Sequence, residues 1–67
     1  MEQPELSDRE LEIIQYLLKG ITAKEIADCL NISVCTVKTH LKNIREKLEA
    51  KKAAEIVAIY YRLGYSA

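Results

Sequence analysis

Three helix-start signals divide this 67-residue chain into segments that are long enough for short helices only. Each signal places a hydroxyl residue, Ser7, Thr22 or Ser33, between two apolar residues at the spacing of a hydrophobic staple. At the first two, a glutamate three residues later completes a capping box, whereas the third has Thr36 in that place. The sequence therefore predicts helices that begin at Ser7, Thr22 and Ser33.

The turns between these helices are expected to be short. Gly20 can end the first helix in the left-handed conformation, and Asn31 is the non-glycine residue best suited to do so after the second. A helix of about eight residues followed by a turn of three or four is typical of a helix-turn-helix. We therefore predict a single all-α domain over residues 1–67, with a helix-turn-helix core over about residues 22–48.

The third helix is expected to have one buried and one exposed face. Apolar residues repeat at intervals of three and four and form one stripe: Val34, Val37, Leu41, Ile44 and Leu48. The opposite face contains Cys35, Thr39, Lys42, Asn43 and Glu46. The flanks contain Lys38 and Arg45 on one side, and Thr36, His40 and Lys47 on the other. Long cationic side chains beside a threonine are what a helix needs to contact base edges in DNA.

Charge is unevenly distributed, although ten basic and ten acidic side chains balance overall. Residues 1–28 contain seven acidic and three basic side chains, whereas residues 29–67 contain three acidic and seven basic ones. A localised basic stripe indicates nucleic-acid binding better than net charge does, but an ordinary solvated helix face has the same composition. We expect electrostatic docking on DNA by Lys24, Arg45, Lys47, Lys51 and Lys52.

A fourth helix is predicted over about residues 52–63, ending at Gly64. Its main apolar stripe contains Ile56, Ile59, Tyr60 and Leu63. Val57, Tyr61 and Ala54 broaden this stripe beyond what packing on three short helices requires, so we predict a homodimer interface that includes Val57, Tyr60 and Tyr61. The alternative is that the tyrosines are ordinary, partly exposed amphipathic residues: Tyr16, Tyr60, Tyr61 and Tyr65.

A longer pattern extends over nearly the whole chain. It consists of Leu6-Ser7-x-Arg9-Glu10-x-Glu12-Ile13, Gly20, Lys24-Glu25-Ile26-Ala27, Leu30, Ser33 and Thr36-Val37-Lys38-x-His40-Leu41-x-Asn43-Ile44-x-x-Lys47-Leu48. This pattern resembles the LuxR-type (FixJ or NarL effector) DNA-binding domain of bacterial transcriptional regulators. The resemblance implies four helices, of which the second and third form the helix-turn-helix, the third enters the major groove and the fourth mediates dimerisation.

The resemblance also implies site residues. The positions similar to those that face bases are Lys38, Thr39 and Lys42. The positions similar to those that contact the DNA backbone are Thr22, Lys24, Thr36, His40 and Lys47, and charge adds Arg45. For His40, packing beside the core carries equal weight. The acids are expected to cap helices or pair within the domain, because they would repel phosphate: Glu10, Glu12 and Glu25.

The chain departs from the family after Leu48. The family usually has a glycine there, followed by an Asn-Arg pair before the last helix, whereas this chain has Glu49-Ala50-Lys51-Lys52-Ala53 without a stop signal. We expect a break near Ala50. The alternative is one continuous helix that would allow domain swapping.

Several classes of function are disfavoured by what the sequence contains. Cys29, Cys35 and the single His40 do not have the spacing of a metal site, so no metal or cofactor is expected. No arrangement of catalytic groups indicates an enzyme. No membrane span or leader is present, which favours the cytoplasm.

The favoured function is sequence-specific transcription regulation on double-stranded DNA, and RNA polymerase is a candidate partner. Two alternatives remain open. One is a helical protein-interaction module that has no DNA affinity and dimerises through the fourth helix. The other is a promoter-reading region of a sigma factor. The chain is either a carboxy-terminal part of a longer regulator or a stand-alone one.

Overall fold

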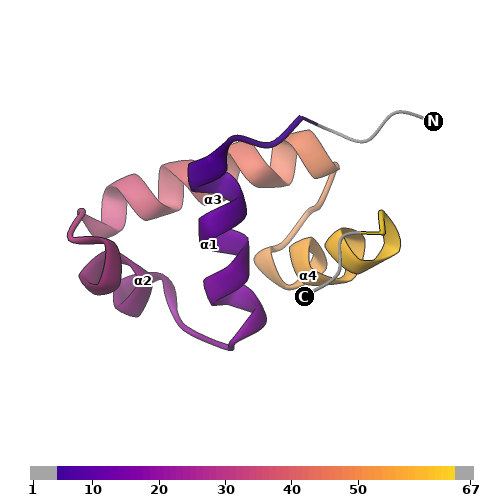
Figure 1. Cartoon of the computed structure of the whole chain (residues 1–67). Helices are drawn as coiled ribbons and strands as arrows, with labels where there is room; N and C mark the ends of the chain where they lie inside the picture. The colour runs from indigo at the N-terminus through magenta and orange to yellow at the C-terminus, as the bar shows by residue number, and fades with distance from the viewer. Residues whose placement is uncertain (1–4, 65–67) are drawn as a thin grey trace.

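Four short helices account for most of residues 5–64, which the computed structural model describes (Figure 1). They are α1 (Asp8–Leu18), α2 (Ala23–Leu30), α3 (Val34–Leu48) and α4 (Ala53–Arg62). Within this range there is no strand, so the predicted all-α, four-helix fold is confirmed.

The first three helices begin where the sequence predicts. The Ser7 Oγ accepts a hydrogen bond from the Glu10 amide, and the Glu10 carboxylate accepts one from the Ser7 amide. Thr22 and Glu25 make the same reciprocal pair at the start of α2. Ser33 accepts from the amide of Thr36 without a returning bond, as expected from the missing glutamate. Each of these hydrogen bonds satisfies an amide that the first helical turn leaves unpaired.

The ends of α1, α2 and α3 share one geometry. Each has a residue in the left-handed conformation, namely Gly20 (φ 79°), Asn31 (φ 57°) and Glu49 (φ 58°). The next amide then donates to a carbonyl five residues earlier, over 3.2 Å at Ile21, 3.0 Å at Ile32 and 2.8 Å at Ala50. This is the Schellman arrangement, which pairs carbonyls that the helix itself leaves open.

The break between α3 and α4 therefore lies where it was expected. Glu49 leaves the helical conformation and α4 begins at Ala53, so the two helices are separate. The Glu55 carboxylate then accepts the backbone amides of Lys51 and Lys52 over 2.6 and 3.2 Å. These bonds secure the start of α4 without help from a side chain at Lys52 itself.

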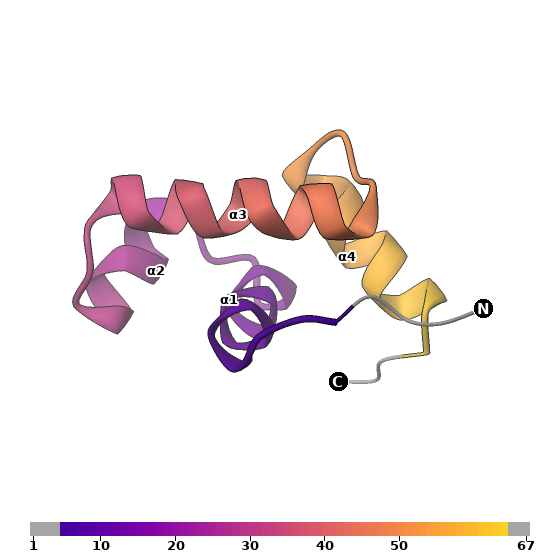
Figure 2. The same cartoon turned by 90° about the horizontal axis from the view of Figure 1, so that it is seen from above.

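The core lies where the other three helices meet α3. Helix α3 packs against α1, α2 and α4, and α1 also packs against α4. In Figures 1 and 2, α2 and α4 lie near opposite ends of α3, with α1 between them. The fully buried side chains are Ile13, Ile14, Ile26, Val37, Ile44 and Ile56. On α3 the predicted stripe is confirmed, since Val37, Ile44 and Leu48 are buried and Val34 and Leu41 are half-buried.

Tyr60 is a core residue. It is 4% exposed, and its hydroxyl accepts a 2.8 Å hydrogen bond from Gln15 Nε2 on α1. A ring buried within the protomer offers no surface to a second copy, so the prediction of a dimer contact for Tyr60 is corrected. Tyr61 is 53% exposed and Val57 is half-buried, so both stay accessible. Tyr65 lies outside the described residues.

None of the helices in the described range is long and apolar enough to cross a bilayer.

Candidate nucleic-acid interface

One side of α3 is left uncovered by the packing. Figure 2 shows α1 and α2 on the same side of α3, and no helix lies along the opposite side of its N-terminal half. The exposed residues of α3 up to Glu46 are Cys35, Thr36, Lys38, Thr39, Lys42, Asn43 and Glu46. Lys38, Thr39 and Lys42, which were predicted to contact bases, all belong to this exposed set.

Thr39 has a defined hydrogen bond within its own helix. Its Oγ1 donates to the carbonyl oxygen of Cys35 over 3.1 Å. A threonine hydroxyl has one proton, so this bond uses the only donor of the Thr39 side chain. What Thr39 can still present to a ligand is an acceptor oxygen and a methyl group.

Basic side chains surround this surface. Lys24 is exposed in the first turn of α2, and Lys51 and Lys52 are exposed in the turn between α3 and α4. Arg45 is half-buried, and its Nε is a buried nitrogen without a hydrogen-bond partner in the part of the chain that the structure describes. The accessible positive charge thus lies mainly on Lys24, Lys38, Lys42, Lys51 and Lys52.

Thr22 and Glu25 close the N-terminus of α2. Besides the capping box, the Thr22 Oγ1 donates to Glu25 Oε1 over 3.0 Å. The hydrogen bonds from the backbone and side chain of Thr22 hold the pKa of Glu25 below its usual range. Thr22 is exposed, but its hydroxyl proton is already bound to Glu25, so a phosphate would have to compete for it.

The two remaining flank positions differ in exposure. Thr36 is exposed, and its hydroxyl lies 2.8 Å from the Ser33 hydroxyl. His40 is half-buried, which fits packing beside the core as well as contact at the edge of the surface. Neither residue is brought into contact with the lysines of α3 by a recorded hydrogen bond or ion pair.

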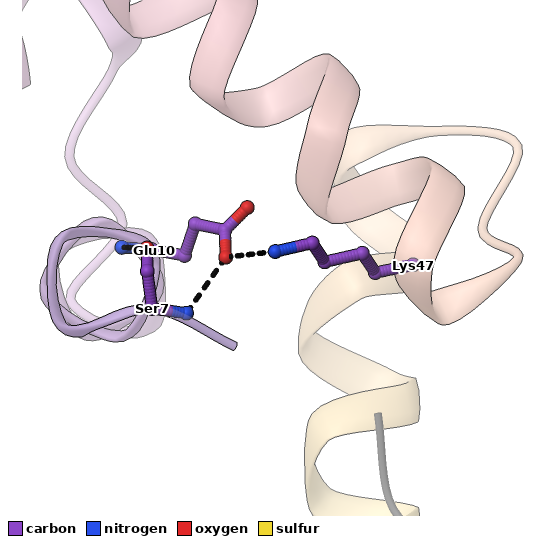
Figure 3. A network of polar contacts seen from close by, with 3 residues as sticks. All are labelled: Ser7, Glu10 and Lys47. Carbon is purple, nitrogen blue, oxygen red and sulfur yellow. Dashed lines mark hydrogen bonds and ion pairs between the residues drawn. The ribbon is translucent and has the colours of Figure 1, made fainter. Parts of the chain in front are cut away.

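Lys47 makes an ion pair across the fold. Its Nζ lies 2.7 Å from Glu10 Oε1, the same oxygen that accepts the Ser7 amide over 2.8 Å (Figure 3). The Glu10 side chain is 5% exposed and that of Lys47 is 41% exposed. Burial opposes ionisation of Glu10, but the hydrogen bonds from Lys47 and Ser7 outweigh it and hold the pKa of Glu10 below its usual value.

This ion pair changes the interpretation of Lys47. A buried carboxylate that loses its partner is costly, so the ammonium group is held by the protein rather than offered to phosphate. We therefore remove Lys47 from the expected backbone contacts. No sequence signal joins Lys47 to Glu10, because they are 37 positions apart on different helices.

The acids predicted to act within the domain do so. Glu10 caps α1 and pairs with Lys47, and Glu25 caps α2. Glu12 pairs with Arg9 over 3.2 Å at the surface of α1. None of the three competes with phosphate at the uncovered side of α3.

Metal-binding groups are sparse in this range. Among residues 5–64, no three His, Cys, Asp or Glu side chains come together as a metal site would require. Cys29 and Cys35 are both free thiols at exposed positions.

Comparison with known proteins gives a consistent result. The family model described as "Bacterial regulatory proteins, luxR family" matches residues 4–60. The uncharacterized response regulatory protein YgeK of Escherichia coli is 42% identical over 60 residues, which cover 90% of this chain and 41% of YgeK. The response regulator VraR of Staphylococcus aureus is 42% identical over 52 residues, which cover 78% of this chain and 25% of VraR. The chain spans less than half the length of both relatives.

Solved structures show the same likeness. The response regulator ChrA of a heme-sensing two-component system superposes with a TM-score of 0.88 at 33% identity, covering 98% of this chain and 33% of ChrA. A phage VqmA–DPO complex superposes with a TM-score of 0.86 at 34% identity, covering 96% of this chain and 30% of that one.

Proposed function

The chain belongs to the luxR family of bacterial regulatory proteins, and we propose that it regulates transcription by sequence-specific binding of α3 in the major groove of DNA. One observation carries this proposal: Lys38, Thr39 and Lys42 are exposed together on the side of α3 that no helix covers. An α-helix fits the major groove, and lysine side chains there reach the acceptor atoms of guanine.

Phosphate contacts would then come from the charges around α3. Lys24, Lys51 and Lys52 are exposed, and Arg45 contributes to the extent that its half-buried guanidinium reaches the surface. Thr22, Thr36 and His40 lie beside these groups and are proposed as further backbone contacts. Such contacts position the helix but carry no sequence information, so they set affinity and its dependence on salt.

We further propose that two copies bind together through α4. Tyr61 is exposed and Val57 is half-buried on that helix, which leaves an apolar surface after the core is complete. Dimers of helix-turn-helix proteins bind half-sites about one helical turn apart. Residues 1–67 would act as one DNA-binding domain in the cytoplasm, with RNA polymerase as a candidate partner.

The exposed Tyr61 also fits a second function, that of a protein-interaction module without DNA affinity. The net charge of zero is the other observation that favours it. Binding to DNA separates the two functions.

The test is selection from a random duplex library at two salt concentrations, followed by sequencing of the bound pool. The wild type should enrich a motif with two-fold symmetry, and the Lys38→Ala, Lys42→Ala double variant should lose it. Lys42→Ala alone should lower specific affinity by about 1–3 kcal/mol and relax preference at one base. Lys51→Ala should weaken all duplexes similarly. No enrichment at either salt concentration would favour the interaction module.

A further inference from the structure

Thr39 is the one uncharged residue among the three proposed base contacts. In a helix, the threonine side chain divides between two rotamers, one of which lets the hydroxyl bond a carbonyl of the preceding turn. Thr39 adopts that rotamer, with Oγ1 donating to Cys35 O over 3.1 Å. The methyl carbon Cγ2 occupies the other branch and carries no polar group.

This bond limits which base edges Thr39 can read. With its proton committed, the hydroxyl cannot donate to the acceptors that guanine, adenine and thymine present in the major groove. It can still accept from the amino groups of adenine or cytosine, and the methyl can make an apolar contact. In unmodified DNA, the major groove offers one methyl group, the C5-methyl of thymine.

We infer that Thr39 is a specificity-determining residue that reads the C5-methyl group of a pyrimidine, supplied by thymine in unmodified DNA. The inference rests on the proposed function and adds the chemical group that is recognised. The methyl is favoured over the acceptor oxygen because Oγ1 is held against the backbone of its own helix, whereas the methyl has no competing contact of that kind.

The neighbouring lysines define the surroundings of this contact. Lys38 and Lys42 are one helical turn apart and flank Thr39 in the sequence, so their side chains lie on adjacent parts of the same surface. Lysine is suited to the O6 and N7 atoms of guanine. Each half-site should therefore contain a thymine next to positions where guanine is preferred.

The test uses duplexes enriched by the wild-type chain, with thymine replaced by deoxyuridine at one position at a time. This replacement removes the methyl group and changes nothing else on the base edge. At one position in each half-site, wild-type affinity should fall about fourfold, which is the equivalent of about 0.8 kcal/mol for one buried methyl group. The same measurement is made with Thr39→Val, which keeps the methyl, and Thr39→Ser, which keeps the hydroxyl.

Thr39→Val should remain sensitive to deoxyuridine at that position, and Thr39→Ser should be insensitive. The source of the methyl is distinguished by placing cytosine or 5-methylcytosine at the same position. The wild type and Thr39→Val should prefer the methylated base about fourfold, whereas Thr39→Ser should not distinguish the two. Circular dichroism melting checks that the variants are folded to the same extent.

Two results would overturn the inference. One is a wild type that tolerates deoxyuridine at every position of its enriched duplexes. The other is Thr39→Ser that keeps the preference while Thr39→Val loses it, which would make the hydroxyl the reading group. Failure of the wild type to enrich any duplex would be a different result, because it would refute the proposed function itself and this inference with it.

Discussion

The Lys47 Nζ donates a 2.7 Å hydrogen bond to Glu10 Oε1, and this bond ties the last turn of α3 to the first turn of α1. Because Glu10 Oε1 also accepts the Ser7 amide, one carboxylate oxygen serves both the helix cap and the interhelical pair. The position of α3 relative to α1 is thus coupled to the conformation of the residues that start the fold. Loss of either partner should be felt at both places.

Lys47→Gln should reduce stability without changing how affinity depends on salt. Removing one partner of a fully buried ion pair costs about 3–5 kcal/mol, and the partial exposure of Lys47, at 41%, lowers our expectation to about 2 kcal/mol. The measurement is urea unfolding, combined with DNA binding over a range of salt concentrations at a temperature where the variant is folded.

Lys51→Gln is the matched control for Lys47→Gln. It should keep the stability of the wild type and reduce the slope of log affinity against log salt by about 0.9, the amount expected for one lost phosphate contact. A similar loss of slope in Lys47→Gln would show that its ammonium does contact phosphate.

Acid should destabilise the fold, and Glu10→Gln should remove part of that effect. The folded-state pKa of Glu10 lies below the ordinary value of 4.5, so its stabilising contribution is present above that pH and is lost as the pH falls through the lower, folded value. Urea unfolding between pH 3 and pH 7 should show a shallower decline for Glu10→Gln. The pKa of Glu25 is lowered too, so the double variant with Glu25→Gln should be shallower still. An unchanged decline in both variants would contradict this assignment.

Glu49→Gly should stabilise the chain. A side chain in the left-handed conformation costs about 1–2 kcal/mol, and glycine recovers this at the expense of a larger loss of backbone entropy. We expect a net gain of about 1 kcal/mol, measured as a higher melting temperature. Asn31→Gly is the control and should gain less, because asparagine tolerates a positive φ. A lower melting temperature for Glu49→Gly would show that its side chain makes a compensating contact.

Tyr61 and Tyr60 should separate dimerisation from stability. Tyr61→Ser should weaken self-association and cooperative binding to paired half-sites, while stability changes by less than about 0.5 kcal/mol because the ring is exposed. Tyr60→Phe should lose about 1 kcal/mol of stability with its Gln15 hydrogen bond and leave association unchanged. Sedimentation velocity measures association, and an unaffected Tyr61→Ser dimer would exclude this face of α4 as the interface.

What could be predicted from the sequence is mostly what is encoded within a few residues. The starts at Ser7, Thr22 and Ser33 follow from side chains three positions apart, and the left-handed end at Asn31 follows from the residue type. The exposed face of α3 follows from helical periodicity, which places Lys38, Thr39 and Lys42 correctly on the exposed surface.

What could not be predicted depends on which elements meet. Glu49 takes a left-handed conformation for which its residue type gives no signal. Tyr60 belongs to a helix that is apolar on several sides, so periodicity alone cannot separate its core face from its accessible one. The partner of Lys47 becomes evident only when α1 and α3 pack together.

The shared geometry of the helix ends also bears on how fast the chain folds. The capping bonds span three residues and the closing Schellman bonds span five, so most of the geometry can form while the rest of the chain is still unfolded. Helical proteins dominated by such local contacts fold in microseconds to milliseconds. The Gln15–Tyr60 and Glu10–Lys47 bonds join residues 45 and 37 positions apart, and should form last. Changes at these two bonds should therefore speed unfolding and leave the folding rate nearly unchanged.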